Sequence, residues 1–517
     1  MPKIFVIGID GATWNLLNPM IEKNKMQNIL KIKKEHISAR LVSTIPPATG
    51  TAWPSFATGC FPNKHGIFDF VKIQKNQKTS IATSHDINVP TIFEYLDFVG
   101  KKSIIINHPL MYNLKLKNGM IFADFLSPKI YAYPKSAEKY LDDYRIFWDR
   151  NKLSRATSKE ITEDIIDVEK KRLKLTLKLI KNEWDIFFVL FSGTDWISHK
   201  YFSEMEHMTE RGTTAFKVFE FVDNAIGEII EHIDRETILL IMSDHGFCSK
   251  KYSFNINQWL VSNGFLKYQR TKEKKEFDAL NKLRNIQVEQ NKENIHLSMR
   301  IKNKIKKIIF DMLIDLNIFK KYTIDWNSSL ADIPTHNCFG IYINKNNVTD
   351  YEIFIDQLVE KMKDVIHLTT GEKVFKFVET TKKIYGKKPP DAPDILFLLH
   401  NDFSHRCVTN YTNREKPTIF SQVHGDDHSL FGIFLAYGPN ITPSKLDTIN
   451  IIDIAPTILN LMMYDAPPHM DGKSFFRQIY TADVPELKTL KDITRNKEDK
   501  TYLEKEKIKE QIKSLKL

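Results

Sequence analysis

The sequence has few cysteines and lacks long hydrophobic runs. It contains 4 cysteines in 517 residues, widely scattered and without a Cys-x-x-Cys pair. The pattern therefore predicts neither a disulfide framework nor a thiolate zinc site. The longest apolar run surrounds Ile186–Phe191 and is far shorter than the roughly 18–20 residues that span a bilayer. The sequence therefore predicts no transmembrane segment.

The N-terminus lacks the pattern of a signal peptide. Met1, Pro2 and Lys3 lead directly into the apolar run Ile4–Ile9, without the longer apolar stretch and small-residue cleavage site of a secretory signal. Free cysteines are typical of a reducing compartment. We therefore expect a cytoplasmic protein.

An excess of charge of one sign is absent from most of the chain. The net charge is +11, but residues 267–307 hold 13 Lys and Arg against 5 Asp and Glu, and residues 486–517 hold 10 against 7. The rest of the chain is balanced at 52 against 52. The excess predicts solvated helices on an insertion and a tail, with a surface for anionic lipid or nucleic acid as the alternative. No clear nucleic-acid partner follows from it.

Composition and periodicity favour a layered α/β fold. Apolar residues make up 42% and charged residues 27%, as in ordinary globular proteins, and the length suggests about three domain-sized units. Short, continuous apolar runs alternate with stretches of helical spacing, which favours a largely parallel sheet covered by helices on both faces. The expected strands are Lys3–Ile9, Lys102–Ile106, Ile186–Phe191, Thr237–Met242, Asp394–Leu398 and Gly432–Ala436, and the expected helices are Pro90–Val99, Ser158–Lys181 and Thr213–Ile233.

The pattern changes along the chain and predicts its domains. We expect an α/β core at 1–266 and 400–485. A basic, mostly helical insertion follows at 267–330, and a small α+β cap or core extension at 331–399 includes a helix at Asp350–Val365. The charged tail, 486–517, is predicted either as a docked helix or as a disordered segment.

Acidic residues and histidines follow several of the expected strands. Asp10 follows the first strand, Asp195 with His199 follows another, and Asp244 with His245 follows a third. One Asp after a strand is usually a turn residue or helix cap. Parallel strands, however, bring their carboxyl ends to one crevice, where ligands bind. Asp and His together suit zinc when no thiolate is available.

Hydroxyl side chains suggest a nucleophile. Residues 45–59 are predicted to form a turn that opens a short helix, which carries Thr49, Thr51 and Ser55. A hydroxyl at a helix N-terminus lies near unpaired N–H groups, which stabilise an alkoxide and an incoming phosphate. The alternative is that Thr49 or Thr51 is only an N-cap.

These motifs, in this order, resemble the alkaline phosphatase superfamily, and within it the type I phosphodiesterases and nucleotide pyrophosphatases with their uncharacterised prokaryotic relatives. The resemblance covers most of the chain, apart from 267–330 and the tail. It implies an alkaline-phosphatase-like three-layer sandwich with a helical insertion and a small α+β cap. The blocks that carry it are Asp10-Gly11, Pro46–Gly59, Asn63–Ile67, Asp195–His199, Ser243–Gly246, Gly425–Pro439, Asp453–Ile458 and Met470–Lys473.

The resemblance implies two divalent metal ions. Asp10, Asp244 and His245 would hold one of them, with Thr49 as bridging ligand and nucleophile. Asp195, His199 and a late histidine would hold the other. The family spacing selects His428 for that position, and His424 stays open as the alternative. The other histidines are not expected to be ligands. We expect His65 to support the turn after the nucleophile helix, and His108 and His336 to be structural or surface residues.

The ligand set implies hydrolysis of a phosphate ester. We expect cleavage of a phosphodiester or a nucleotide-type pyrophosphate through a phosphothreonine at Thr49, with zinc in the site and manganese as fallback. The substrate would be a small phosphate ester or a nucleotide-like molecule. The alternatives are a phosphomonoesterase or phosphomutase of the same superfamily, and a catalytically inert binding protein with a basic insert. The intact ligand set argues against the inert protein.

Overall fold

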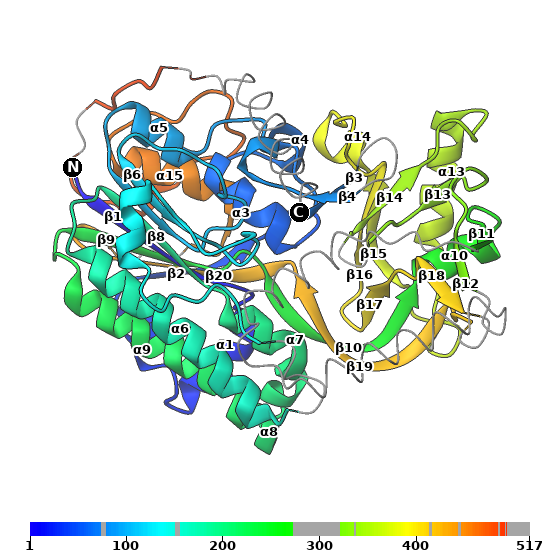
Figure 1. The fold of residues 1–517 in the computed structure, drawn as a ribbon, viewed down its shortest axis with the longest axis horizontal. Helices are drawn as coiled ribbons and strands as arrows, with labels where there is room; N and C mark the ends of the chain where they lie inside the picture. The colour runs from blue at the N-terminus through cyan, green and yellow to red at the C-terminus, as the bar shows by residue number, and fades with distance from the viewer. Residues whose placement is uncertain are drawn as a thin grey trace, which may run out of the picture.

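The computed structural model has a larger lobe built on one extended sheet and a smaller lobe of antiparallel sheets (Figure 1). None of its described helices is long and apolar enough to cross a membrane. The structure describes residues 1–73, 79–149, 156–271, 321–335, 338–412, 416–442, 446–483, 486–491 and 493.

The sheet of the larger lobe has 9 strands in the order β21-β2-β20-β9-β1-β8-β5-β6-β7. Its centre, from β9 to β6, is parallel, whereas β20 runs antiparallel to both β9 and β2. The continuous apolar sequences of the central strands fit burial on both faces. The strands are β1 (Lys3–Ile9), β2 (Ile37–Val42), β5 (Ser103–Ile106), β6 (Gly119–Phe122), β7 (Ala132–Tyr133), β8 (Ile186–Phe191), β9 (Thr237–Met242), β20 (Phe431–Tyr437) and β21 (Thr448–Asn450).

Helices cover both faces of this sheet, with α6 and α9 on one side and α3, α5 and α15 on the other (Figure 1). The arrangement confirms the predicted three-layer α/β fold with a largely parallel sheet. The helices are α1 (Trp14–Glu22), α2 (Gln27–Glu35), α3 (Thr49–Thr58), α4 (Pro62–His65), α5 (Ile92–Phe98), α6 (Ser158–Ile180), α7 (Gly193–Glu206), α8 (Glu210–Ala215), α9 (Lys217–His232), α15 (Ile454–Leu461) and α16 (Phe476–Ile479). A hairpin, β3 (Val71–Ile73) with β4 (Thr79–Ile81), follows α4.

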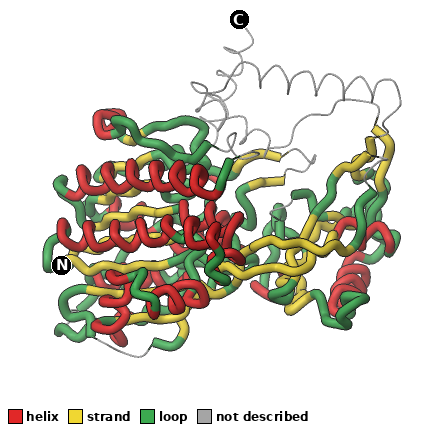
Figure 2. Tube along the Cα trace, turned by 90° about the horizontal axis from the view of Figure 1, so that it is seen from below, coloured by secondary structure: helices red, strands yellow, loops and turns green. Residues whose placement is uncertain are grey.

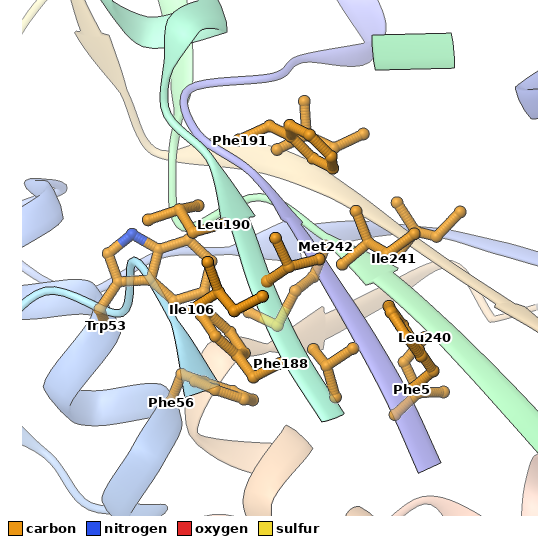
Figure 3. Packing of buried hydrophobic residues seen from close by; sticks show 14 of the residues in the cluster. Phe5, Trp53, Phe56, Ile106, Phe188, Leu190, Phe191, Leu240, Ile241 and Met242 are labelled. Carbon is orange, nitrogen blue, oxygen red and sulfur yellow. The ribbon is translucent and has the colours of Figure 1, made fainter. Parts of the chain in front are cut away.

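Aromatic packing fixes α3 against the sheet (Figure 3). The rings of Trp53 and Phe56 lie 5.4 and 5.6 Å from that of Phe188 on β8. Trp53 also lies directly over Gly8 on β1, where an added Cβ would come within 2.6 Å of the indole. Gly8 therefore permits the close approach of helix and strand that places the N-terminus of α3 near the end of β1.

The smaller lobe is joined to the core by the antiparallel strands β10 and β19, which run from one lobe to the other in the views of Figures 1 and 2. It has its own apolar cluster, which includes Phe254, Ile341 and Phe397. Its elements are β10 (Gly246–Asn255), α10 (Ile256–Ser262), β11 (Tyr268–Thr271), β12 (Lys321–Ile324), β13 (Ala331–Asp332), β14 (Gly340–Ile343), α13 (Tyr351–Lys363), β15 (Phe375–Thr380), α14 (Thr381–Tyr385), β16 (Ile395–Leu399), β17 (Phe403–Arg406), β18 (Asn410–Thr412) and β19 (Phe420–Ser429).

Several expectations differ from the structure in detail. The run Asp394–Leu398 forms β16 of the smaller lobe and does not join the main sheet, because it pairs with β14 and β15. The expected helix Thr213–Ile233 is divided between α8 and α9. At the ends of the predicted insertion, β11 and β12 pair as strands, whereas 272–320 and most of the tail lie outside the described residues. The domain boundaries stay a prediction.

Candidate active site

Two neighbouring strands of the main sheet end in the first group of predicted ligands. Asp10 follows β1, and Asp244 and His245 follow β9, the parallel neighbour of β1. Gly11 takes a positive φ of 68°, which turns the chain after Asp10, and its N–H donates to Asp244 Oδ1 at 3.2 Å. The turn therefore ties the two strand ends together, and the three ligand side chains are almost fully buried.

Four atoms with lone pairs converge at this point. His245 Nε2 lies 3.6 Å from Asp10 Oδ1, 3.3 Å from Asp244 Oδ2 and 3.0 Å from Thr49 Oγ1. Thr49 is the first residue of α3 and follows the N-cap, Ala48. The interpretation of Thr49 or Thr51 as an N-cap is therefore wrong. The hydroxyl of Thr49 instead faces the Asp/His cluster.

The protonation of this cluster favours a bound cation. His245 Nδ1 lies 3.0 Å from the carbonyl oxygen of Gly246, which can only accept, so Nδ1 carries the proton and Nε2 presents its lone pair. Burial lowers the pKa of His245 to about 4, which keeps the imidazole neutral. Burial and the charge of Asp244 raise the pKa of Asp10. Asp10 Oδ1 and Asp244 Oδ2 accept no hydrogen bond within the described structure. A divalent cation would satisfy these atoms together.

A second cluster adjoins the first. His428 Nε2 lies 3.3 Å from Asp195 Oδ1 and 3.0 Å from His199 Nε2, and His199 Nε2 lies 3.5 Å from the same Asp195 oxygen. Asp195 and His199 are four residues apart on α7, so they share one face of the helix. The ring of His428 stacks on that of His245 with centroids 3.8 Å apart, which places the two clusters side by side.

The charges in the second cluster also suit a cation. Burial works to raise the pKa of Asp195, but the charges of His199 and His428 outweigh it and lower that pKa. The pKa of His428 is raised because the hydrogen bond and charge of Asp195 outweigh its burial. Two imidazole nitrogens that face each other beside one carboxylate oxygen need either a shared proton or a metal ion. Two groups of side chains have ligand atoms close enough together to hold an ion. They are Asp10, Asp244 and His245, and Asp195, His245 and His428.

Neighbouring side chains hold the second cluster in position. Thr194 Oγ1 donates to the carbonyl oxygen of Asp10 at 2.6 Å, which connects the start of α7 to the first cluster. The carboxylate of Asp426, on β19, accepts from the backbone N–H groups of Phe202 and Ser203 at 2.9 and 3.1 Å. These bonds fix β19, and with it His428, against α7 and His199.

A buried ion pair beneath α7 was not expected from the sequence. Glu169 and Arg172 on α6 pair with each other, and both side chains are 0% exposed. Glu169 Oε1 also accepts from the N–H of Gly193, the first residue of α7, at 2.6 Å. Periodicity alone places charged residues of a long helix in solvent. The sequence signal for this pair is that Arg172 lies three residues after Glu169, but such pairs of opposite charge are equally common on exposed helices.

The other hydroxyl groups of α3 lie apart from the clusters. Ser55 Oγ lies 2.8 Å from His65 Nε2, and His65 Nδ1 accepts from the N–H of Ile67 at 3.2 Å. His65 therefore donates to Ser55 of α3 and accepts from the chain just after α4, which agrees with a structural role for this histidine. Thr51 is fully buried, and its hydroxyl has no hydrogen-bond partner within the described structure.

The remaining predicted histidines have separate surroundings. His108 is buried among aromatic rings, including those of Trp53, Phe56 and Phe188, which agrees with a structural role. His336 lies outside the described residues, and the structure describes only the strand on which His424 lies. The choice of His428 over His424 as ligand, like the ligand set itself, stays a prediction.

Comparisons with solved structures agree on the fold. A phosphonoacetate hydrolase from Sinorhizobium meliloti 1021 aligns with a TM-score of 0.53 at 13% identity, over 88% of this chain and 94% of its own. Human ectonucleotide pyrophosphatase / phosphodiesterase 5 aligns with a TM-score of 0.51 at 13% identity, over 92% and 99%. The alkaline phosphatase PafA aligns with a TM-score of 0.54 at 13% identity, over 92% and 99%.

The sequence match identifies the family. No curated protein matches the chain in sequence. Residues 4–333, more than half of the chain, match the family described as type I phosphodiesterase / nucleotide pyrophosphatase. The predicted superfamily is confirmed by this match and by the fold, and the superfamily depends on metal ions, for which the Asp/His clusters are candidate sites. The chain belongs to the type I phosphodiesterase / nucleotide pyrophosphatase family and is a hydrolase of phosphoric esters.

Proposed function

We propose that this protein cleaves a phosphodiester or a nucleotide-type pyrophosphate at a two-metal site, with Thr49 as the nucleophile. The observation that carries the proposal is the position of the Thr49 hydroxyl at the N-terminus of α3, 3.0 Å from His245 Nε2. His245 has a ligand atom close to both groups, Asp10 with Asp244 and Asp195 with His428, and we assign it to the first ion and add His199 to the second. One ion would be held by Asp10, Asp244, His245 and Thr49, and the other by Asp195, His199 and His428.

Each residue of the site has a defined task in this proposal. The chemistry that two bound cations supply is a lower pKa for the attacking hydroxyl and stabilisation of charge on the attacking and leaving oxygens. Thr49 Oγ1 gives up its proton to solvent and bonds to phosphorus while the bond from phosphorus to the leaving oxygen breaks. The leaving oxygen takes up a proton from solvent and departs as an alcohol or a phosphate. Water then cleaves the Thr49 phosphoester and restores the hydroxyl. The N–H groups at the start of α3 are oriented to bind the phosphoryl oxygens.

Zinc is the metal that these ligands suit best. Both clusters combine carboxylate oxygens with imidazole nitrogens and have no thiolate, and His245 is neutral and presents a lone pair. Such mixed O/N sites bind zinc well, and manganese is the fallback. We also propose a cytoplasmic location, because all 4 cysteines are free and 3 of them are buried.

A phosphomonoesterase is the second candidate. It is favoured by the fold, since a structure named as an alkaline phosphatase aligns as well as one named as an ectonucleotide pyrophosphatase. A phosphomutase would share the same phosphothreonine. The inert binding protein is disfavoured because the site keeps the complete predicted ligand set.

Substrate screening with metal analysis tests the proposal. The purified protein should turn over p-nitrophenyl diesters or nucleotide p-nitrophenyl esters with zinc or manganese, and it should contain about two metal ions per chain. A preference for p-nitrophenyl phosphate would favour the monoesterase. A protein without bound metal and without turnover of any of these esters would contradict the proposal.

A further inference from the structure

A pocket lies between the two lobes, beside the candidate metal site. Its volume is about 260 Å³, and its lining includes His428, the predicted metal ligand, and Pro47, which precedes Thr49 by two positions. The remaining lining comes from the core on one side and from the smaller lobe on the other. A molecule that reacts at Thr49 could therefore extend into this space.

The charged groups of the pocket are mainly positive. Arg40 from β2, Lys250 from β10 and Lys376 from β15 all line it, and among the described lining residues Asp427 from β19 is the one carboxylate. These residues come from four separate elements, so the positive charge gathers only where the two lobes meet. The local field favours an anionic ligand.

Lys250 is the most informative of these residues. It is 7% exposed, and the charge that it shares the pocket with is that of Asp427, whose pKa the ammonium group of Lys250 lowers against the effect of burial. Its neighbour Lys251 is mostly exposed and pairs with Asp402 at 3.0 Å. Asp427 can balance only one of the three cationic side chains of the lining. The pocket therefore keeps an excess of positive charge at a buried lysine, which an anionic ligand would offset.

Apolar surface completes the pocket. Phe339, Phe403 and Phe431 contribute to its lining, and the guanidinium group of Arg40 lies 4.3 Å from the centre of the Phe431 ring. Aromatic and apolar walls with a few convergent polar groups are typical of sites for small organic ligands. The ligand that fits these walls therefore combines an anionic group with a ring or another apolar portion.

We infer that the pocket binds an anionic substituent of the substrate, a carboxylate or a second phosphate carried on an apolar or ring-bearing group, and that Lys250 is the residue that selects for it. This inference rests on the proposed function, because it assigns the substrate class of the same site. Lys250 contacts the substrate away from the reacting atoms, so it determines specificity and leaves the chemical step to Thr49.

A matched pair of diesters tests the inference. The probes are 4-nitrophenyl 4-carboxyphenyl phosphate and its uncharged analogue, 4-nitrophenyl 4-carbamoylphenyl phosphate. In the wild type, kcat/KM should be about tenfold or more higher for the carboxylate. In Lys250→Met, which keeps the side-chain volume, the ratio should fall close to one while turnover of the carboxamide persists. Lys251→Met, the exposed neighbour, should keep the wild-type ratio.

Binding without turnover separates the two proposals. Calorimetric titration of the EDTA-treated protein with each diester measures the same preference when no reaction takes place. A carboxylate preference that depends on Lys250, in a protein that hydrolyses neither diester after metal loading, would support the pocket and contradict the proposed function. Turnover of both diesters with equal kcat/KM, or a preference unchanged in Lys250→Met, would overturn the pocket and leave the proposed function standing.

Discussion

Replacing Glu169 by Gln tests whether the buried ion pair supports the site. The pair with Arg172 is 0% exposed on both sides, and Glu169 also accepts from the N–H of Gly193 at the start of α7. The amide oxygen of Gln can keep the bond to Gly193, but it leaves the guanidinium of Arg172 without its counter-charge. Removal of one partner from a buried pair costs about 3–5 kcal/mol, compared with roughly 1 kcal/mol for a neutral hydrogen bond.

Urea unfolding of matched variants measures this cost. We expect Glu169→Gln to lower the free energy of unfolding by about 3–5 kcal/mol at unchanged m value. The double variant Glu169→Gln with Arg172→Met removes the stranded charge and should regain most of the loss. A cost below about 1 kcal/mol for Glu169→Gln, or a double variant less stable than the single one, would refute the reasoning.

Three further predictions address the metal ligands, the pH dependence and the insertion. His428→Ala should lose about one metal ion per chain, whereas His424→Ala should keep both; the opposite result in metal analysis would move the ligand assignment by four residues. Burial lowers the pKa of His108 to about 4, so the unfolded chain binds a proton between pH 6.5 and 4 that the folded protein does not. Over this range the wild type should lose about 1.4 kcal/mol of unfolding free energy for each unit by which the pH falls, relative to His108→Phe. Parallel pH profiles of the two proteins in urea unfolding would contradict this. An Asn-Gly turn in place of residues 272–320 would connect the paired strands β11 and β12. This variant should keep its metal content and its turnover of a small chromogenic ester. Loss of bound metal would show that the segment helps to build the site.

The main sheet was predictable because its strands are buried on both faces. A strand such as β8 (Ile186–Phe191) is continuously apolar and bounded by turn residues, so its sequence indicates its state without tertiary information. The direction of a strand and the strands with which it pairs cannot be derived from its own sequence in this way. The apolar run of β20 resembles those of the parallel strands, but β20 pairs antiparallel with its neighbours. The run of β16 also resembles them, but β16 lies in the smaller lobe. The direction of β20 and the location of β16 are set by contacts with residues far away in the sequence.

The side chains that we propose as ligands could be singled out from the sequence because most of them follow a strand or begin a helix, although their role as ligands stays a prediction. Asp10 directly follows β1 and Asp244 lies two positions after the end of β9, where a parallel sheet gathers its strand ends. The residues that position them were not predictable. Glu169 and Asp426 act through backbone N–H groups of α7 that are 24 and 224 positions away along the chain, and no local pattern indicates such a bond.

The measurement that tests the central claim most directly is the turnover and metal content of Thr49→Ala beside Ser55→Ala and Thr51→Ala. Loss of the nucleophile should reduce kcat on a p-nitrophenyl diester by roughly a thousandfold or more. The metal content of Thr49→Ala should stay near two, because the Asp and His ligands remain, and the other two variants should keep turnover. An active Thr49→Ala protein, with Ser55→Ala or Thr51→Ala inactive instead, would contradict the assignment of Thr49 as the nucleophile.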